Sequence, residues 1–413
     1  MESYRLFGIS PKDSLAIAQD LYTSGYISYP RTSSQQLPES LGIVKIFSML
    51  SKQIGYNKLI ELLLKKKSLK PNNGKKTDPA HPAIYPTGEQ PKKLDDKNQK
   101  VYDLIVRRTL STFGDDAERE TMEIVFDAKN EKFVARGTRT TKAGWHIFYE
   151  PYLRLQEEEF PELKQGQEVK VLKIDLQNLE TQPPKRYTPA SIIKELERRN
   201  LGTKATRAAI VDTLFQRGYT TGKAIEATEL GMTLVNTLEK YSPDILDEEL
   251  TRHFEDEMEK IREKNLSEKE VLQEAEDILK KILEKFKKNE MPIGKELLAA
   301  KRESQRIAET LGPCNVCKIG EIKILSSKKT GKKFAACNRY PDCKTTYSLP
   351  QQALIIKTEK ICEKCNTPII RVIRRGKRPF EMCLDTKCIT KADWGKKREY
   401  KKKEETTVNS DEL

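Results

Sequence analysis

The residues with the clearest chemical potential lie at 25–34, where the sequence reads GYISYPRTSS. Tyr29 offers a phenolic oxygen that can act as a nucleophile, and Arg31 offers a forked, permanently charged guanidinium that can hold phosphate oxygens. Pro30 lies between them and fixes one φ angle, and so part of their relative orientation. The pair could meet one phosphate together, although a tyrosine near a helix end more commonly packs with its hydroxyl in water.

A short helix must position this segment. The run at 15–22 is amphipathic, Ser10 can cap it, Pro11 suits its first turn and Gly25 suits its C-terminal exit. We therefore expect Tyr29 to lie on a rigid exit from a helix.

Two segments resemble the active-site motifs of type IA DNA topoisomerases, in a form close to the archaeal one. In that family the second tyrosine of the 25–34 motif is the nucleophile, so the resemblance implies that Tyr29 cleaves DNA and that Arg31 assists at the scissile phosphate. Residues 80–88, AHPAIYPTG, resemble the family's His-x-Ala-Ile-x-Pro-Thr segment. Its histidine contacts the phosphate near the cleavage site, which implies this role for His81. A lone histidine is more often structural, and the neighbouring Tyr29 motif favours the catalytic interpretation.

A second DNA contact is expected within 187–262, which reads as helical. Residues 201–210, LGTKATRAAI, form a helix–turn–helix pattern with a basic turn, a unit that is as often a packing device as a DNA reader. The segment resembles the family's Gly-x-Pro-(Ser/Ala)-Thr-(Tyr/Arg)-Ala stretch, which lines the single-strand groove. The resemblance implies DNA contacts for Thr206, Arg207 and Lys204, although Lys204 stands where the family often has proline. The other two histidines, His146 and His253, are interpreted as structural.

All eight cysteines follow residue 313, and such clustering favours metal over disulfides in a chain with no secretion signal. Their spacing, C-x2-C-x19-C-x5-C and then C-x2-C-x17-C-x4-C, predicts two four-thiolate zinc sites. The first would use Cys314, Cys317, Cys337 and Cys343, and the second Cys362, Cys365, Cys383 and Cys388. Both resemble the family's C-terminal zinc ribbons. Zinc would hold these small folds, and basic side chains around it, Arg339, Arg374 and Arg375, are the expected DNA contacts.

The composition agrees with a polyanionic partner. The 413 residues contain 76 Lys and Arg against 62 Asp and Glu, a formal charge of +14. We expect DNA, single-stranded or negatively supercoiled, as the partner, and a lysine-rich solubilising surface is the plainer alternative. The sequence has no apolar run long enough for a membrane span and no secretion signal, so the expectation is a cytoplasmic, nucleoid-associated protein without a membrane partner.

We expect a mixed α/β multidomain fold, mainly helical, with a β-rich arch segment and two small C-terminal zinc ribbons. Met122, Ile124 and Phe126 recur at every second position, and 144–149 and 169–171 extend this β signal. The predicted domains are a tyrosine-bearing helical domain at 1–113, the arch segment at 114–186, a helical DNA-groove domain at 187–300, zinc ribbons at 301–350 and 351–395, and a disordered charged tail at 396–413.

The resemblance also implies parts that this sequence does not show. Type IA enzymes carry a Toprim domain ahead of the tyrosine, with an Asp-x-Asp cluster for Mg²⁺, whereas only 28 residues precede Tyr29 and no Asp-x-Asp pair occurs. We therefore expect the C-terminal part of a split enzyme, whose separate Toprim chain binds Mg²⁺. It would cleave and reseal one strand through a 5′-phosphotyrosine and relax negatively supercoiled DNA. No ATP is implied, since no phosphate-binding Gly-x4-Gly-Lys-(Ser/Thr) loop occurs.

Two other interpretations stay open. The chain could be a non-catalytic single-stranded-DNA-binding zinc-ribbon protein left from a truncated topoisomerase gene. A zinc-ribbon transcription factor would explain 314–388 but neither Tyr29 nor His81.

Overall fold

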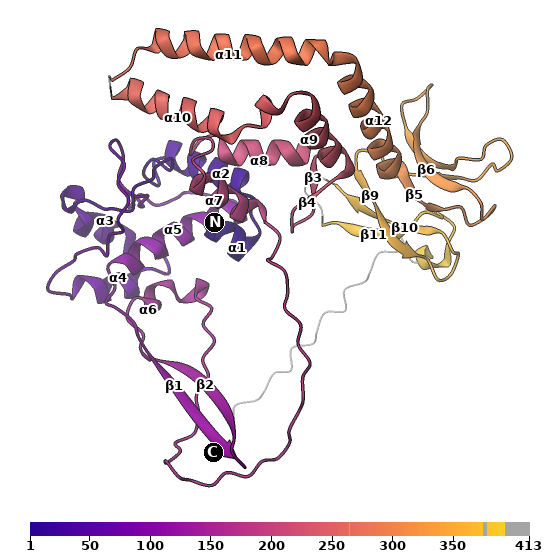
Figure 1. The fold of residues 1–413 in the computed structure, drawn as a ribbon. Helices are drawn as coiled ribbons and strands as arrows, with labels where there is room; N and C mark the ends of the chain where they lie inside the picture. The colour runs from indigo at the N-terminus through magenta and orange to yellow at the C-terminus, as the bar shows by residue number, and fades with distance from the viewer. Residues whose placement is uncertain (264, 375–377, 393–413) are drawn as a thin grey trace. The chain divides into compact units, whose positions relative to one another are not determined.

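The computed structural model describes residues 1–263, 265–374 and 378–392. The chain divides into two compact units, Met1–Lys288 and Asn289–Leu413 (Figure 1). The tail predicted at 396–413 lies outside the described residues, and the finer domain boundaries remain predictions. None of the helices in the described part is long and apolar enough to cross a bilayer.

The first unit begins with a helical domain around one apolar core. Its helices are α1 (Glu2–Phe7), α2 (Pro11–Thr23), η1 (Glu39–Leu41), α3 (Ile43–Leu50), α4 (Asn57–Leu64) and α5 (Asp96–Thr112). The core contains Leu21, Phe47, Ile60 and Leu110, all almost fully buried. The expected boundaries of α2 are confirmed, because the Ser10 hydroxyl accepts from the Asp13 N–H and Pro11 opens the helix.

A long antiparallel hairpin follows, made of β1 (Glu118–Ala128) and β2 (Glu131–Lys142). Lys129 and Asn130 have φ of 56° and 72° and form its two-residue turn, a conformation that suits the twist of a hairpin. The predicted alternation is confirmed, since Ile124 pairs with Ala135 and Phe126 with Phe133.

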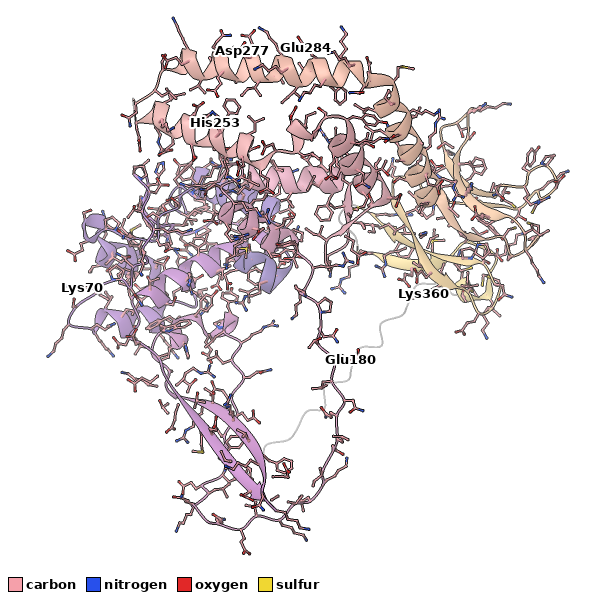
Figure 2. All side chains as sticks on the ribbon, viewed as in Figure 1. Lys70, Glu180, His253, Asp277, Glu284 and Lys360 are labelled. Carbon is pink, nitrogen blue, oxygen red and sulfur yellow. The ribbon has the colours of Figure 1, made fainter. Side chains whose placement is uncertain are left out.

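The strand prediction was wrong at 144–149 and 169–171. Residues 146–149 form the helix α6 (His146–Tyr149), followed by η2 (Glu150–Tyr152), and 169–171 belong to a stretch without helix or strand that includes Glu180 (Figure 2). Phe148 and Tyr149 are buried, and Phe148 packs in the helical core. Aromatic residues therefore gave a β signal where tertiary packing selects a helical turn.

Asp103 joins η2 to this helical domain. Its carboxylate accepts hydrogen bonds from the Tyr56 hydroxyl at 2.8 Å, from the Tyr152 hydroxyl, and from Arg107 Nε at 3.1 Å. Burial and the neighbouring carboxylate of Asp103 raise the pKa of Tyr56, so this phenol stays protonated and donates. The network links α4, α5 and the start of the irregular segment.

The rest of the first unit is helical. Its elements are α7 (Pro189–Arg198), α8 (Arg207–Gln216), the two-residue strands β3 (Thr220–Thr221) and β4 (Glu226–Ala227), α9 (Glu229–Tyr241), η3 (Pro243–Leu246), α10 (Glu248–Arg262) and α11 (Glu268–Lys288). Thr188 caps α7 through a capping box with Ser191, and Pro189 occupies the first turn of the helix. Helices α10 and α11 run alongside each other (Figure 1).

The second unit contains α12 (Glu290–Glu309) and two small sheets. One sheet has the order β5-β6-β7-β8, with β5 (Thr310–Pro313), β6 (Glu321–Ser326), β7 (Lys333–Cys337) and β8 (Thr346–Ser348). The other has the order β11-β10-β9, with β9 (Leu354–Ile361), β10 (Pro368–Ile373) and β11 (Phe380–Cys383), and η4 (Ile389–Lys391) follows. The sheets share one core, because Ile370 and Val372 of β10 are buried together with Leu311 and Ile322.

Candidate active site

Backbone hydrogen bonds join the segment of Tyr29 to the segment of His81. Ile27 forms a β-bridge with Pro86, and the Ser28 N–H donates to the Tyr85 carbonyl at 2.9 Å. Thr32 adds a side-chain link, since its hydroxyl donates to the His81 carbonyl at 3.1 Å. Two motifs about 50 residues apart in the sequence are thus held as one structure.

The ring of Tyr29 lies between two other rings. Its centroid is 4.5 Å from that of His81 with the planes inclined by 45°, and 5.3 Å from that of Tyr22 in an edge-on arrangement. Tyr29 is half-buried, so its ring is held by packing while the residue keeps some contact with solvent. This arrangement suits a nucleophile, because it fixes the ring without sealing it in the core.

Arg31 is exposed two residues further on. Among the described residues its guanidinium makes no hydrogen bond or ion pair, so it can bind an external anion without first breaking a contact. Arg31 lines a hollow of about 360 Å³ together with Gln19 and Asp20 of α2 and Ala208 of α8. The structure therefore brings Arg31 and the start of α8, which follows the predicted DNA-binding turn, to the same hollow.

Asp78 is a site residue that the sequence analysis missed. Its carboxylate accepts hydrogen bonds from Ser33, through the N–H at 3.2 Å and the hydroxyl at 3.1 Å, and from the N–H groups of Ala80 at 3.1 Å and His81 at 3.3 Å. Lys204 Nζ donates to the same carboxylate at 2.6 Å. The hydrogen bonds from Lys204 and from these backbone groups hold the pKa of Asp78 far below its ordinary value. This carboxylate thus connects three segments: the one that follows Tyr29, the one that contains His81, and the basic turn before α8.

The predicted DNA contacts near α8 differ in availability. Thr206 and Lys204 are exposed, but the Thr206 hydroxyl accepts from the Thr203 N–H at 2.9 Å and Lys204 is paired with Asp78. Arg207 is half-buried, and its Nε donates to the Leu201 carbonyl at 2.9 Å. Arg207 therefore has a structural role, because this hydrogen bond holds the turn in shape.

The first cysteine group has the geometry of a zinc site. The sulfur atoms of Cys314, Cys317, Cys337 and Cys343 lie within 4.8 Å of one another, at 3.8 Å between Cys314 and Cys343 and 3.6 Å between Cys317 and Cys337. A tetrahedron with Zn–S bonds of about 2.3 Å has edges of about 3.8 Å. The backbone N–H groups of Ile319 and Gly320 lower the pKa of the Cys317 thiol to about 6. They therefore favour the thiolate, the form that binds metal.

The second cysteine group repeats this arrangement. Its pairs are 3.8 Å apart between Cys362 and Cys388 and 3.2 Å between Cys365 and Cys383. Thr390 lowers the pKa of Cys388 to about 6, whereas burial raises the pKa of Cys383 to about 12. A bound cation would offset that burial, so both groups fit Zn²⁺ by donor type and geometry.

The arginines predicted near these groups are placed unequally. Arg339 is exposed and lies 3.6 Å from the Asp342 carboxylate, an ion pair that solvent weakens. Arg374 is half-buried, and its Nε has no hydrogen-bond partner in the part of the chain that the structure describes. Arg375 lies outside the described residues.

No metal site is built beside Tyr29 from the described residues. The described residues contain three potential metal-binding groups: the two cysteine groups and one formed by His253, Glu257 and Glu274. None of the three includes a residue from the segment around Tyr29. Asp78, the acidic residue nearest to His81 in the hydrogen-bond network, already accepts from four residues. These residues do not fit a magnesium site.

Comparison with known proteins agrees with this geometry. A family model described as DNA topoisomerase matches residues 1–273, which include Tyr29, His81 and the turn before α8. DNA topoisomerase 1 of Pyrococcus horikoshii is 45% identical over 398 residues, which cover 95% of this chain and 57% of that protein. The chain belongs to the type IA DNA topoisomerase family.

Other members of the family extend the comparison. DNA topoisomerase 1 of Methanothermobacter thermautotrophicus is 45% identical over 387 residues, covering 94% of this chain and 52% of that protein. The full-length topoisomerase I structure from Thermotoga maritima has a TM-score of 0.56 at 22% identity, and covers 87% of this chain and 57% of that one. The likeness to that topoisomerase shows a shared fold. This chain spans about half the length of the two curated relatives, with 57% and 52% of them covered.

Proposed function

We propose that this chain carries the strand-cleaving tyrosine of a type IA topoisomerase. The Tyr29 hydroxyl gives up its proton as its oxygen attacks a DNA phosphorus and forms an O–P bond. The bond from phosphorus to the 3′ oxygen breaks, and that oxygen takes up a proton to become a 3′ hydroxyl. The 5′ end stays attached to Tyr29 while the other strand passes, and the 3′ hydroxyl then attacks and releases the tyrosine. One phosphodiester replaces another in each step, so no ATP is required. The observation that carries the proposal is the half-buried Tyr29 ring packed on His81.

Arg31 and His81 would stabilise charge at the phosphate. The guanidinium of Arg31 is exposed and has no partner among the described residues, so it is available to bind the phosphate oxygens that become more negative during attack. His81 packs on the nucleophile's ring, and its backbone is fixed by Asp78 and Thr32. Both positions match the motifs that carry these roles in the family.

A Toprim-bearing polypeptide would supply the remaining groups. Since the described residues near Tyr29 do not form a magnesium site, we assign the family's Mg²⁺ and its acid–base residues to that part. The relatives are about twice as long as the stretch that they share with this chain, which leaves room for such a region.

DNA would be bound by basic and hydroxyl side chains on both units. In the first unit the candidates are Lys204, Thr206 and Arg207 in the turn before α8, and in the second Arg339 and Arg374. The formal charge of +14 favours a polyanion in general, and the family favours single-stranded or negatively supercoiled DNA in the cytoplasm.

Reconstitution tests the proposal. The tagged chain is used to isolate a Toprim-bearing polypeptide from the native cell, and the pair is given Mg²⁺ and negatively supercoiled plasmid. We expect relaxation without ATP and a covalent 5′ adduct that maps to Tyr29 by mass spectrometry. Tyr29→Phe should abolish both, while Tyr22→Phe, which changes the neighbouring ring, should retain them.

The alternative is a DNA-binding protein without catalysis. It would be supported if the wild-type pair binds single strands yet gives no adduct. Relaxation by Tyr29→Phe at the wild-type rate would reject Tyr29 as the nucleophile.

A further inference from the structure

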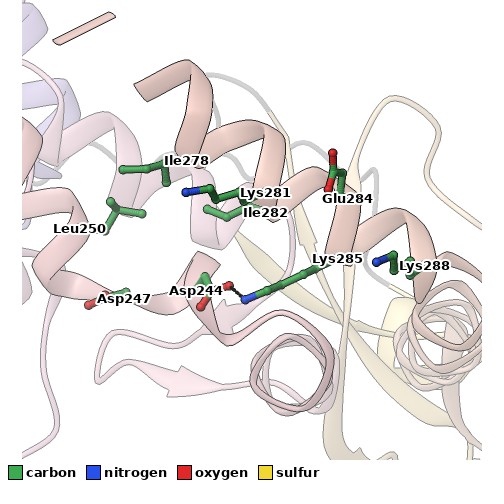
Figure 3. Close-up of a pocket in the computed structure, with 9 residues that line it drawn as sticks. All are labelled: Asp244, Asp247, Leu250, Ile278, Lys281, Ile282, Glu284, Lys285 and Lys288. Carbon is green, nitrogen blue, oxygen red and sulfur yellow. Dashed lines mark hydrogen bonds and ion pairs between the residues drawn. The ribbon is translucent and has the colours of Figure 1, made fainter. Parts of the chain in front are cut away.

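Helices α10 and α11 are joined by an unusual contact. Among the described residues of α10 the buried side chain is a carboxylate, Glu257, which is only 8% exposed, and on α11 the buried residue is Val271. Beyond this contact, toward η3, the two helices enclose a hollow of about 460 Å³ (Figure 3). Nine residues line it: Asp244, Asp247, Leu250, Ile278, Lys281, Ile282, Glu284, Lys285 and Lys288. Apolar packing is therefore sparse along this pair.

Three potential ligands converge where the helices do meet. His253 of α10, labelled in Figure 2, has its Nε2 atom 2.9 Å from Glu274 Oε1 of α11 and 3.5 Å from Glu257 Oε1, one turn further along α10. The other oxygen of Glu257, Oε2, is buried and has no hydrogen-bond partner in the described part of the chain. One ligand atom from each residue lies within 4.8 Å of the others.

The hydrogen bonds present leave this cluster incompletely paired. Burying a carboxylate oxygen without a donor is costly, and two carboxylates close together repel each other. The single Nε2 atom is shared between Glu257 and Glu274, so one imidazole proton cannot serve both. A divalent cation would satisfy both carboxylates and the imidazole lone pair at once.

We propose that His253, Glu257 and Glu274 form a third metal site, which takes Zn²⁺. One imidazole nitrogen and two carboxylates are ligands that zinc accepts, and bonds of about 2.1 Å give ligand separations of about 3.4 Å in a tetrahedron. The imidazole favours Zn²⁺ over Mg²⁺ or Ca²⁺, which prefer all-oxygen sites. His253 and Glu274 are partly exposed, so water can complete the coordination. Bound metal would fasten α10 to α11 where apolar packing is sparse.

Zinc titration of the full chain tests the site. The protein is first loaded at its cysteine groups and freed of loosely held metal, and zinc content and calorimetric binding are then measured. We expect one further equivalent of Zn²⁺ in the wild type. Glu257→Gln and His253→Gln should each weaken this step at least about tenfold. Asp256→Asn, which removes an exposed charge next to Glu257, should leave it unchanged.

Cobalt substitution adds a readout that identifies the ligands. Cysteine-bound Co²⁺ gives thiolate charge-transfer absorption, whereas Co²⁺ at the third site should add visible bands without it. Circular dichroism of each variant checks that the helices are retained. A wild-type chain that takes up only its two cysteine-bound ions, or a further equivalent that both variants retain, would show that His253 and Glu274 are a simple interhelical hydrogen bond.

Discussion

The Tyr29 and His81 rings lie 4.5 Å apart at an inclination of 45°, although 52 positions separate the two residues in the sequence. The bridge between Ile27 and Pro86 and the hydrogen bond from Thr32 to the His81 carbonyl fix this pairing through the backbone. The histidine ring thus packs against the ring of the proposed nucleophile. Its removal should therefore affect the chemical step more than binding.

We expect His81→Ala to slow strand cleavage by on the order of 10²–10³, because one preorganised charge-stabilising group is lost. Single-stranded DNA affinity should change only a few-fold. The measurement is single-turnover cleavage of a 5′-labelled oligonucleotide by the reconstituted pair, with Tyr22→Phe as control. Cleavage at the wild-type rate would remove His81 from the active site.

Asp78 should make the free energy of unfolding decrease when the pH is lowered into the acid range. Its pKa is lowered in the folded chain relative to about 3.9 in the unfolded chain. The ionised carboxylate therefore stabilises the fold above about pH 4, and this contribution is lost as the pH falls further, toward the folded pKa. Asp78→Asn should lower the free energy of unfolding at pH 7 by about 1–3 kcal/mol and flatten this acid dependence.

Urea unfolding at pH 7 and at pH 3 measures both effects of Asp78. Lys204→Met serves as the partner control, and its cost should stay below about 1 kcal/mol because the ammonium is half exposed. An unchanged acid dependence in Asp78→Asn would contradict the role assigned to this carboxylate.

Asp103→Asn should destabilise the first unit by about 2–3 kcal/mol, since Arg107, Tyr56 and Tyr152 all donate to the ionised carboxylate. Asp96→Asn on the same helix should cost little, because that carboxylate is 80% exposed. Urea unfolding followed by circular dichroism compares the two variants. Equal stabilities would mean that the network contributes nothing.

Arg339→Gln should weaken single-stranded DNA binding and reduce the salt slope of log K by about 0.7, the value for one phosphate contact on a single strand. Fluorescence anisotropy at several salt concentrations measures this slope. Lys269→Gln, an exposed change on α11, is the matched loss of charge. A slope equal to that of the wild type would place Arg339 away from the phosphates.

Loss of the second cysteine group should loosen the first. Ile370 and Val372 lie in the same core as Leu311 and Ile322, so Cys362→Ala should raise the thiol reactivity of Cys314 and its partners as well. Labelling with a thiol reagent followed by mass spectrometry gives the rate for each cysteine, and Glu363→Gln is the neighbouring control. Unchanged protection of Cys314 would show that the two groups are independent.

Short motifs predicted Tyr29, Arg31 and His81 as site residues, and their roles remain predictions. Cysteine spacing predicted which four thiols gather in each group, as the structure confirms. The helix–turn–helix predicted around Lys204 was also confirmed, because α7 ends at Arg198 and α8 begins at Arg207.

Other features depend on contacts between distant segments. Asp78 was missed because its partner Lys204 is 126 positions away, although an Asp-Pro pair three residues before His81 is a turn signal that could have marked it. The helix α6 was missed because Phe148 and Tyr149 have high strand propensity, while packing against the helical core decides their conformation. The cysteine spacing also could not predict that the two sheets share one core, because apolar residues of separate strands form that core.

That shared core gives the C-terminal unit a mechanical property. The β10 side chains pack beside those of β5 and β6, and the Asn315 amide donates to the Cys365 carbonyl at 3.3 Å, so the described parts of the two sheets are fastened to each other. A nucleic-acid strand that contacted both sheets would meet two binding surfaces at a fixed separation. The affinity would then depend on whether the spacing of the phosphates matches that separation.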